Sequence, residues 1–167
     1  MQSVTQKVSM PLIELLSGKL AIFDFDGVIT NTASLHQVAW ATTFDEVLQG
    51  YSGYAPFSLF DYEYYVDGKQ RDDGIRSFLS SRNIDATQDL TNEIANRKNH
   101  YYLSLINSTA NDVLVYEDAF HLIKYLYENS IPMVVASSSK NTSSIIERVG
   151  LEKFFELVVD GNVAEKS

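Results

Sequence analysis

Two carboxylates stand one residue apart at the end of a short apolar run. Asp24 and Asp26 follow residues 20–23 and precede Gly27 in the segment KLAIFDFDGVIT. Like charges this close repel, and burial makes each of them harder to ionise. A hard cation such as Mg²⁺ relieves that cost, and a carboxylate can also attack phosphorus or move a proton. The pair therefore favours a catalytic metal site over the alternative interpretation, an exposed turn before Gly27.

A second polar run, Ser137, Ser138, Ser139, Lys140 and Asn141, directly follows the apolar residues MVVA. Hydroxyls, backbone N–H groups and the start of a predicted helix together favour anion binding, and Lys140 adds a positive charge. The alternative is a solvated turn in which Ser or Asn caps the helix. The carboxylate pair elsewhere in the chain makes the anion site the preferred interpretation.

Both polar runs are predicted to end strands of a parallel sheet. Apolar runs predict buried strands at 20–24, 131–139 and 154–161, and helical periodicity predicts helices at 32–48, 72–81, 89–106, 119–128 and 142–149. The apolar face of the helix over 32–48 is predicted from Leu35, Val38, Ala39, Thr42 and Val47. This order predicts an α/β fold, because strand–helix–strand units form parallel sheets. Ligands of such sheets bind at the carboxyl ends of the strands.

The helices between the first two predicted strands exceed a single crossover. We expect them to form an inserted helical cap over residues 33–105, with residues 1–32 and 106–167 forming a Rossmann-like parallel sheet core. A chain of 167 residues with 45% hydrophobic and 21% charged residues can fill such a core.

Charge and composition argue against several partners and sites. The net charge of -9 disfavours nucleic acid and anionic membranes as partners. The absence of cysteine removes disulfides and thiolate metal sites and is consistent with a cytoplasmic location. No run approaches the roughly 20 apolar residues of a membrane span.

Four segments then resemble one family. DFDGVITNTASLHQVAW, VDGKQRDDG, NRKN and ASSSKN occur in this order. Together they are similar to the haloacid dehalogenase superfamily, and within it to the β-phosphoglucomutase-like subfamily. The resemblance covers nearly the whole chain and implies a Rossmann-like core with an inserted cap. The stretch DYEYYVDGKQRDDGIRSFLSSRNI is more weakly similar to relatives that accompany trehalose- or maltose-degrading enzymes.

The resemblance implies roles for the residues at the strand ends. Asp24 would be the nucleophile that becomes phosphorylated and binds Mg²⁺. Asp26 would be the general acid/base, with its backbone carbonyl also facing the metal. Ser137 would contact the transferring phosphoryl group. The remaining implied substrate- and phosphate-binding residues outside the cap are Gly27, Ser138, Ser139, Lys140 and Asn141.

The resemblance also implies a set of cap residues, each with a structural alternative. Thr32, His36 and Trp40 share one helix face, at the hinge and cap entrance, where His36 would position the acid/base. Arg71 would bind the non-transferring phosphate, for which a guanidinium is suited, unless it is a surface residue facing the neighbouring acids. Lys98 would reach the substrate, unless it lies on a solvated helix face.

Three functions follow as hypotheses. The first is interconversion of β-glucose 1-phosphate and glucose 6-phosphate through an aspartyl-phosphate with Mg²⁺, because Arg71 and Lys140 favour a substrate with phosphates at two ends. The second is a sugar-phosphate phosphatase on the same scaffold. The third is an inactive fragment or phosphate-binding module.

The family's later motifs are not found in this chain. The resemblance implies a third motif with a lysine, near Lys166, and a fourth motif with acidic metal ligands. The acids in VYEDA, Glu117 and Asp118, precede the second strand and are predicted to start a helix. We therefore expect a fragment that is inactive alone, with the first strand left as an apolar edge open to association.

Overall fold

The computed structural model describes residues 16, 18–108 and 113–164, which form two compact units. The first unit takes the described residues up to Thr30 and those from Val115 onward; the second is Asn31–Leu114. The predicted cap, residues 33–105, lies within the second unit. Lys166, the predicted third-motif lysine, lies outside the described residues.

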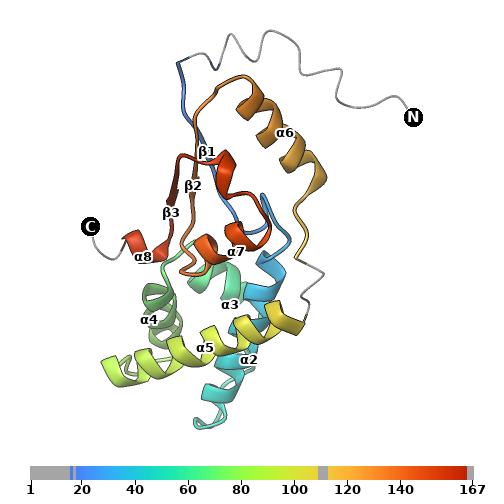
Figure 1. Ribbon diagram of the computed structural model, residues 1–167. Coiled ribbons are helices and arrows are strands. Elements are labelled where there is room, and N and C mark those ends of the chain that lie inside the picture. The colour runs from blue at the N-terminus through green and yellow to red at the C-terminus, as the bar shows by residue number, and fades with distance from the viewer. Residues whose placement is uncertain (1–15, 17, 109–112, 165–167) are drawn as a thin grey trace. The chain divides into compact units, whose positions relative to one another are not determined.

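The first unit contains a parallel three-stranded sheet in the order β1-β2-β3 (Figure 1). The strands are β1 (Ala21–Phe23), β2 (Met133–Ala136) and β3 (Leu157–Val159). Ala21 pairs with Met133, and Val134 pairs with Leu157. The predicted α/β class with a parallel sheet is confirmed, and the register brings the carboxyl ends of all three strands to one edge.

Four short helices accompany the sheet: α6 (Glu117–Glu128), α7 (Thr142–Arg148), the 3₁₀ helix η3 (Glu152–Phe154) and α8 (Gly161–Ala164). Glu117 and Asp118 lie in the first turn of α6, as predicted. The second strand is shorter than the apolar run 131–139 suggested. The amide of Ile131 donates to the Leu126 carbonyl at 3.0 Å, so Ile131 closes the end of α6 instead of extending β2.

The prediction that the first strand is buried is wrong. Leu20 and Ile22 are 50% and 66% exposed, because β1 lies at the edge of the sheet as far as the chain is described. An apolar run predicts burial only when both sides of the strand are covered. The exposed edge agrees with the expectation for a strand that lacks a second neighbour.

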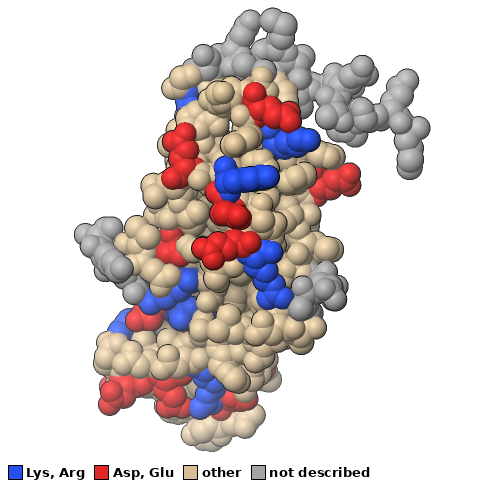
Figure 2. Space-filling view, viewed as in Figure 1, with Lys and Arg blue, Asp and Glu red and all other residues tan. Residues whose placement is uncertain are grey.

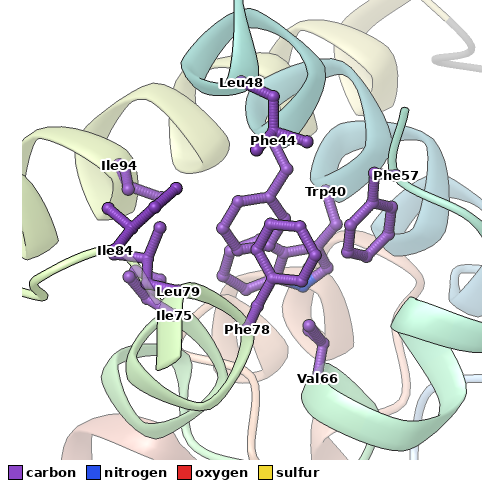
Figure 3. Close-up of a cluster of buried hydrophobic side chains, with 10 residues drawn as sticks. All are labelled: Trp40, Phe44, Leu48, Phe57, Val66, Ile75, Phe78, Leu79, Ile84 and Ile94. Carbon is purple, nitrogen blue, oxygen red and sulfur yellow. The ribbon is translucent and has the colours of Figure 1, made fainter. Parts of the chain in front are cut away.

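The second unit is helical. It contains α2 (Ala33–Leu48), α3 (Leu59–Asp61), the π-helix η2 (Tyr62–Val66), α4 (Arg71–Ser81) and α5 (Gln88–Ser108). Helix α2 packs along α5, and α4 packs against both η2 and α5. Figure 3 shows the core, whose members are Trp40, Phe44, Leu48, Phe57, Val66, Ile75, Phe78, Leu79, Ile84 and Ile94.

The buried face of α2 differs from the predicted one. Val38 was expected inside but is 48% exposed, whereas the buried residues are His36, Ala39, Trp40, Thr43, Phe44 and Leu48. The rings of Trp40 and Phe44 stack with centroids 5.1 Å apart. Large aromatic side chains bury more apolar area than Val or Leu, so they determine which face of the helix turns inward.

The described surface carries both signs of charge. Figure 2 shows acidic and basic side chains interspersed on the viewed face. Among the described residues, no helix has both the length and the apolar character needed to cross a membrane.

A buried ion pair joins the last residue of α3, Asp61, to Arg82 at the end of α4. Asp61 is 3% exposed and accepts from Arg82 Nη2 at 2.6 Å, and its other oxygen accepts from the Ser58 amide and hydroxyl at 2.9 and 2.7 Å. Burial alone would raise the pKa of Asp61, but the hydrogen bonds from Ser58 and the Arg82 charge outweigh it and lower that pKa. The folded unit thus favours the ionised carboxylate.

We expect Asp61→Asn to lower the free energy of unfolding by about 2 kcal/mol at pH 7, because Arg82 loses a charged partner. A carboxylate with a lowered folded pKa stabilises the fold above its ordinary pKa of 3.8. That contribution is lost as the pH falls through the folded value, so the difference between variant and parent should shrink in acid. Urea unfolding at pH 7 and pH 3 measures both effects.

Glu93→Gln is the matched control. Glu93 pairs with Arg97 at 2.6 Å, but its side chain is 59% exposed. Loss of this exposed ion pair should lower the free energy of unfolding by less than about 0.5 kcal/mol at either pH. Equal effects of the two substitutions would contradict a stabilising role for the buried pair.

Candidate functional site

The loop after β1 is a tight turn built on two fully buried apolar side chains, Phe25 and Ile29. The Phe25 carbonyl accepts from the amides of Ile29 and Thr30 at 3.0 and 3.2 Å. The amide of Gly27 donates to the Thr30 carbonyl at 2.8 Å, with φ of +80° at Gly27. Only glycine adopts this conformation at little cost, which explains its place after the carboxylate pair.

This turn places the two carboxylates differently. Asp24 is exposed, and its Oδ1 accepts from the Phe25 amide at 2.7 Å. Asp26 is half-buried, and its Oδ2 accepts from the Ser137 hydroxyl at 3.3 Å. The structure therefore brings Asp26 and Ser137 together across the ends of β1 and β2. The charge that Asp24 carries keeps access to solvent, which lowers the cost of holding two acids in one short turn.

The hydroxyl of Ser137 is held by its own loop. Its Oγ receives the Ser139 amide at 3.1 Å and lies 2.9 Å from the hydroxyl of Thr142, which is fully buried. The Ser137 amide donates to the Val159 carbonyl of β3 at 2.9 Å. When Thr142 and Ser139 donate to Ser137, the proton of Ser137 remains for Asp26. The Thr142 hydroxyl also lies 3.1 Å from the Ser139 carbonyl, so its one proton is shared between two acceptors of the same turn.

The remaining predicted anion-binding residues occupy the same turn. Ser138, Ser139, Lys140 and Asn141 run consecutively from the end of β2 to the start of α7, and all are half-buried. The Ser139 hydroxyl accepts from the Asn141 amide at 3.3 Å. Sequence reasoning missed Thr142, the first residue of α7. A hydroxyl one helical turn beyond the serine run was the only signal for it.

In the second unit, Lys98 is 2% exposed, so the interpretation as a solvated helix face is wrong. Its ammonium lies 2.7 Å from His36 Nδ1 and 4.7 Å from the ring centroid of Tyr102. The His36 and Tyr102 rings stack at 4.0 Å. In its ammonium form Lys98 can only donate, and Nδ1 is then the acceptor of a neutral ring that carries its proton on Nε2. The aromatic faces add favourable cation–π contacts to a charge removed from water.

Of the other predicted cap residues, two are buried and one is half-buried. Thr32 and Trp40 are buried at 0% and 5% exposure, and Trp40 belongs to the hydrophobic core. Arg71 is half-buried at the start of α4, where its Nη2 donates to Asn99 Oδ1 at 3.0 Å. Asn99 thus orients the guanidinium of Arg71.

The residues of the first unit fit a magnesium ion in part. In the described ranges, no group of three or more His, Asp or Glu side chains could hold a metal. Asp24 and Asp26 offer two carboxylates on one short turn, and Mg²⁺ is commonly held by one or two carboxylates with water and phosphate oxygens completing its shell. These donors suit Mg²⁺ better than a softer metal, because the chain has no cysteine.

Comparison with known proteins points to one family. A family model described as "Haloacid dehalogenase-like hydrolase" matches residues 21–167. The chain is 34% identical over 158 residues to a β-phosphoglucomutase of Mycobacterium bovis, covering 86% of this chain and 60% of the relative. It is 30% identical over 151 residues to a β-phosphoglucomutase of Bacillus subtilis, covering 89% and 63%.

A solved structure supports the same assignment. The crystal structure of a β-phosphoglucomutase from Clostridium difficile matches with a TM-score of 0.70 and 28% identity, covering 86% of this chain and 61% of the other. The chain thus spans between 60% and 63% of the length of these curated relatives.

We expect Thr142→Val to disturb the Ser137 hydroxyl, because the isosteric side chain cannot donate to it. The amide resonances of Ser137 and Ser139 should shift, and stability should fall by about 1–2 kcal/mol. Thr142→Ser should restore the parent resonances. Two-dimensional ¹H–¹⁵N NMR and urea unfolding measure these outcomes.

Thr43→Val is the control. Thr43 is also fully buried, and its hydroxyl donates to the Ala39 carbonyl at 2.7 Å within α2. It should change stability but leave the resonances of residues 137–141 in place. If both variants leave those resonances unchanged, Thr142 does not orient Ser137.

Proposed function

The chain belongs to the haloacid dehalogenase-like hydrolase family, and from this premise we propose that its protein transfers a phosphoryl group on a sugar phosphate. The specific reaction we propose is the interconversion of β-glucose 1-phosphate and glucose 6-phosphate. The observation that carries the proposal is the hydrogen bond between Asp26 and Ser137 at 3.3 Å, with Asp24 in the same turn. The β-phosphoglucomutase relatives support the choice of substrate.

Asp24 is the proposed nucleophile because its carboxylate is exposed beside the half-buried Asp26. The cycle begins with Asp24 phosphorylated. Asp26 removes the proton of the free 6-hydroxyl of β-glucose 1-phosphate, that oxygen attacks the phosphorus on Asp24, and the bond from phosphorus to Asp24 breaks, which gives a sugar bisphosphate. In the second step an oxygen of Asp24 attacks the phosphorus at position 1, the bond from phosphorus to that sugar oxygen breaks, and Asp26 gives the oxygen a proton, which releases glucose 6-phosphate and restores phosphorylated Asp24. Mg²⁺ held by the Asp24 carboxylate and the Asp26 backbone carbonyl would neutralise charge on the phosphoryl group.

The proposed partner of Asp26 is Ser137. Its hydroxyl donates to the Asp26 carboxylate in the structure and is supported from behind by Thr142. Such support restricts the orientation of the hydroxyl, so less reorganisation is needed when a phosphoryl oxygen replaces the carboxylate as acceptor.

A second phosphate on the substrate is the feature that favours a mutase. Lys140 and the hydroxyl turn offer positive charge and donors in the first unit. In the second unit, Arg71 is held by Asn99 with a guanidinium that can bind phosphate through two donors. We propose that each of these two sets of groups binds phosphate.

A phosphatase is the second candidate. The exposure of Asp24 favours it, because water could reach an aspartyl-phosphate formed there. A mutase must exclude that water while its two transfer steps take place. The two functions therefore share Asp24 and Asp26 and differ in what attacks the phosphorylated intermediate.

We expect Asp24→Asn to abolish turnover, with at least a ~10³-fold loss, because the amide is a poor nucleophile. Asp26→Asn should lower turnover by about 10²–10⁴-fold through loss of proton transfer. Glucose 6-phosphate formation and phosphate release from β-glucose 1-phosphate with Mg²⁺ should be measured side by side, in this chain and in the complete product of its gene.

The control is Asp73→Asn, an exposed acid in the first turn of α4, which should retain parent activity. Isomerisation that depends on Asp24 would support the mutase, whereas phosphate release alone would identify a phosphatase. If the complete gene product does neither, the proposal fails and a phosphate-binding role replaces it.

A further inference from the structure

We infer that residues 160–162, the turn after β3, are a positioning element for Lys140 in the proposed phosphate-binding turn. The inference rests on the proposed function only for the identity of the ligand. Neither the sequence motifs nor the carboxylate pair drew attention to this segment, DGN, which directly follows the last strand. Three different kinds of contact support the inference, and each involves a different one of its residues.

Asn162 holds the backbone of Lys140. Its side-chain Nδ2 donates to the Lys140 carbonyl at 2.9 Å. The neighbouring amide of Gly161 donates to the Ser139 carbonyl at 3.2 Å. Two successive peptide groups of the phosphate-binding turn are therefore bonded to the turn after β3. Since these residues lie more than twenty positions apart in the sequence, the bonds fix the loop from outside its own segment.

Gly161 supplies the space in which the loop lies. A Cβ at this position would stand 2.6 Å from the Ser138 carbonyl oxygen and 3.0 Å from Lys140 Cγ. The first distance is to backbone, which cannot move away without moving the whole turn. The stem of the Lys140 side chain passes directly over the glycine. Gly161 is thus required for close approach, and any side chain there would push Lys140 aside.

Asp160 anchors the segment itself. Its side chain is part of a residue only 3% exposed, and it accepts from the Ser143 hydroxyl at 2.7 Å and from the Asn162 amide at 2.9 Å. It also accepts from the Val163 amide and from Asn162 Nδ2, each at 3.3 Å. Burial would raise the pKa of Asp160, but the hydrogen bonds from Ser143, Asn162 and Val163 outweigh it and lower that pKa.

These contacts form one path. Asp160 ties the turn to α7 through Ser143 and orients the Asn162 amide group, and Asn162 then holds the Lys140 carbonyl. Residues 137–141 lie between β2 and α7, so the turn is restrained at both ends and at its centre. A cation on a long flexible stem loses less entropy on binding phosphate when its backbone is already fixed.

The test compares Asn162→Ala and Gly161→Ala with the parent chain and with Asn129→Ala. Asn129 is a matched control, because its Nδ2 also donates to a carbonyl, that of Tyr125, at 2.7 Å, but at the end of α6. The probe is inorganic phosphate, followed by ¹H–¹⁵N NMR titration, with urea unfolding measured for each variant. Amide hydrogen exchange of residues 138–140 is measured without ligand.

We expect Asn162→Ala to weaken phosphate binding by about 5–10-fold and to speed amide exchange in the turn, since the hydrogen bond to the Lys140 carbonyl is lost together with the longer one to Asp160. Gly161→Ala should weaken binding more, because the backbone itself must shift. Asn129→Ala should lower stability to a similar extent as Asn162→Ala while leaving phosphate affinity and turn exchange at parent values. In the complete gene product, KM should rise more than kcat falls.

Two results would overturn the inference. In the first, exchange and resonances of residues 138–140 stay at parent values in both variants. In the second, the turn loosens but phosphate affinity is unchanged, which would make the segment structural only. If the parent chain binds no phosphate, the proposed function loses its support, while the exchange data still decide whether residues 160–162 hold Lys140 in place.

Discussion

The hydrogen bond from Ser137 to Asp26 joins residues 111 positions apart, and it exists only because β1 and β2 pair in parallel. Parallel pairing places both carboxyl ends at one edge of the sheet, where each strand gives way to a polar turn. A shift of this register by one residue would break the pairing of Phe23 with Val135 and would move the turns that follow β1 and β2 apart. The chemistry proposed for the chain therefore depends first on the backbone ladder between two short strands.

The turn after β1 contains two acids, Asp24 and Asp26, whose negative charges repel each other. Two features of the structure lower the free-energy cost of this repulsion. Asp24 is exposed to solvent, whereas Asp26 accepts a hydrogen bond from the Ser137 hydroxyl, which in turn contacts Thr142. In the helical unit, the buried Lys98 contacts His36 Nδ1 and the face of the Tyr102 ring, and a cation–π contact of this kind stabilises a positive charge removed from water.

The sequence predicted the parallel α/β class, most of the helices and the polar turns, because these depend on local patterns. Strand limits and burial were harder, as Ile131 and Ile22 show. Ile131 is apolar and buried but ends a helix, and Ile22 is apolar but exposed at an edge. Periodicity in the sequence indicates the secondary structure and burial that a residue favours. Its hydrogen-bond partners and the neighbouring strands determine the secondary structure and burial that it adopts. The same limit concealed Thr142 and Asn162, whose positions become meaningful only through contacts distant in the sequence.

Asp160 and Lys140 show why contacts between residues distant in the sequence determine the geometry of a site. Lys140 lies in the turn between β2 and α7, and its carbonyl accepts from Asn162 Nδ2 at 2.9 Å, so another segment helps to fix its position. Asp160 anchors that segment because its carboxylate is ionised, buried and saturated with donors, which makes its geometry rigid. Asp160 orients the side-chain amide of Asn162, and this amide in turn holds the Lys140 backbone carbonyl, so hydrogen bonds transmit the position of one turn to the other. The position of Lys140 therefore depends on a segment that lies 22 positions further along the chain.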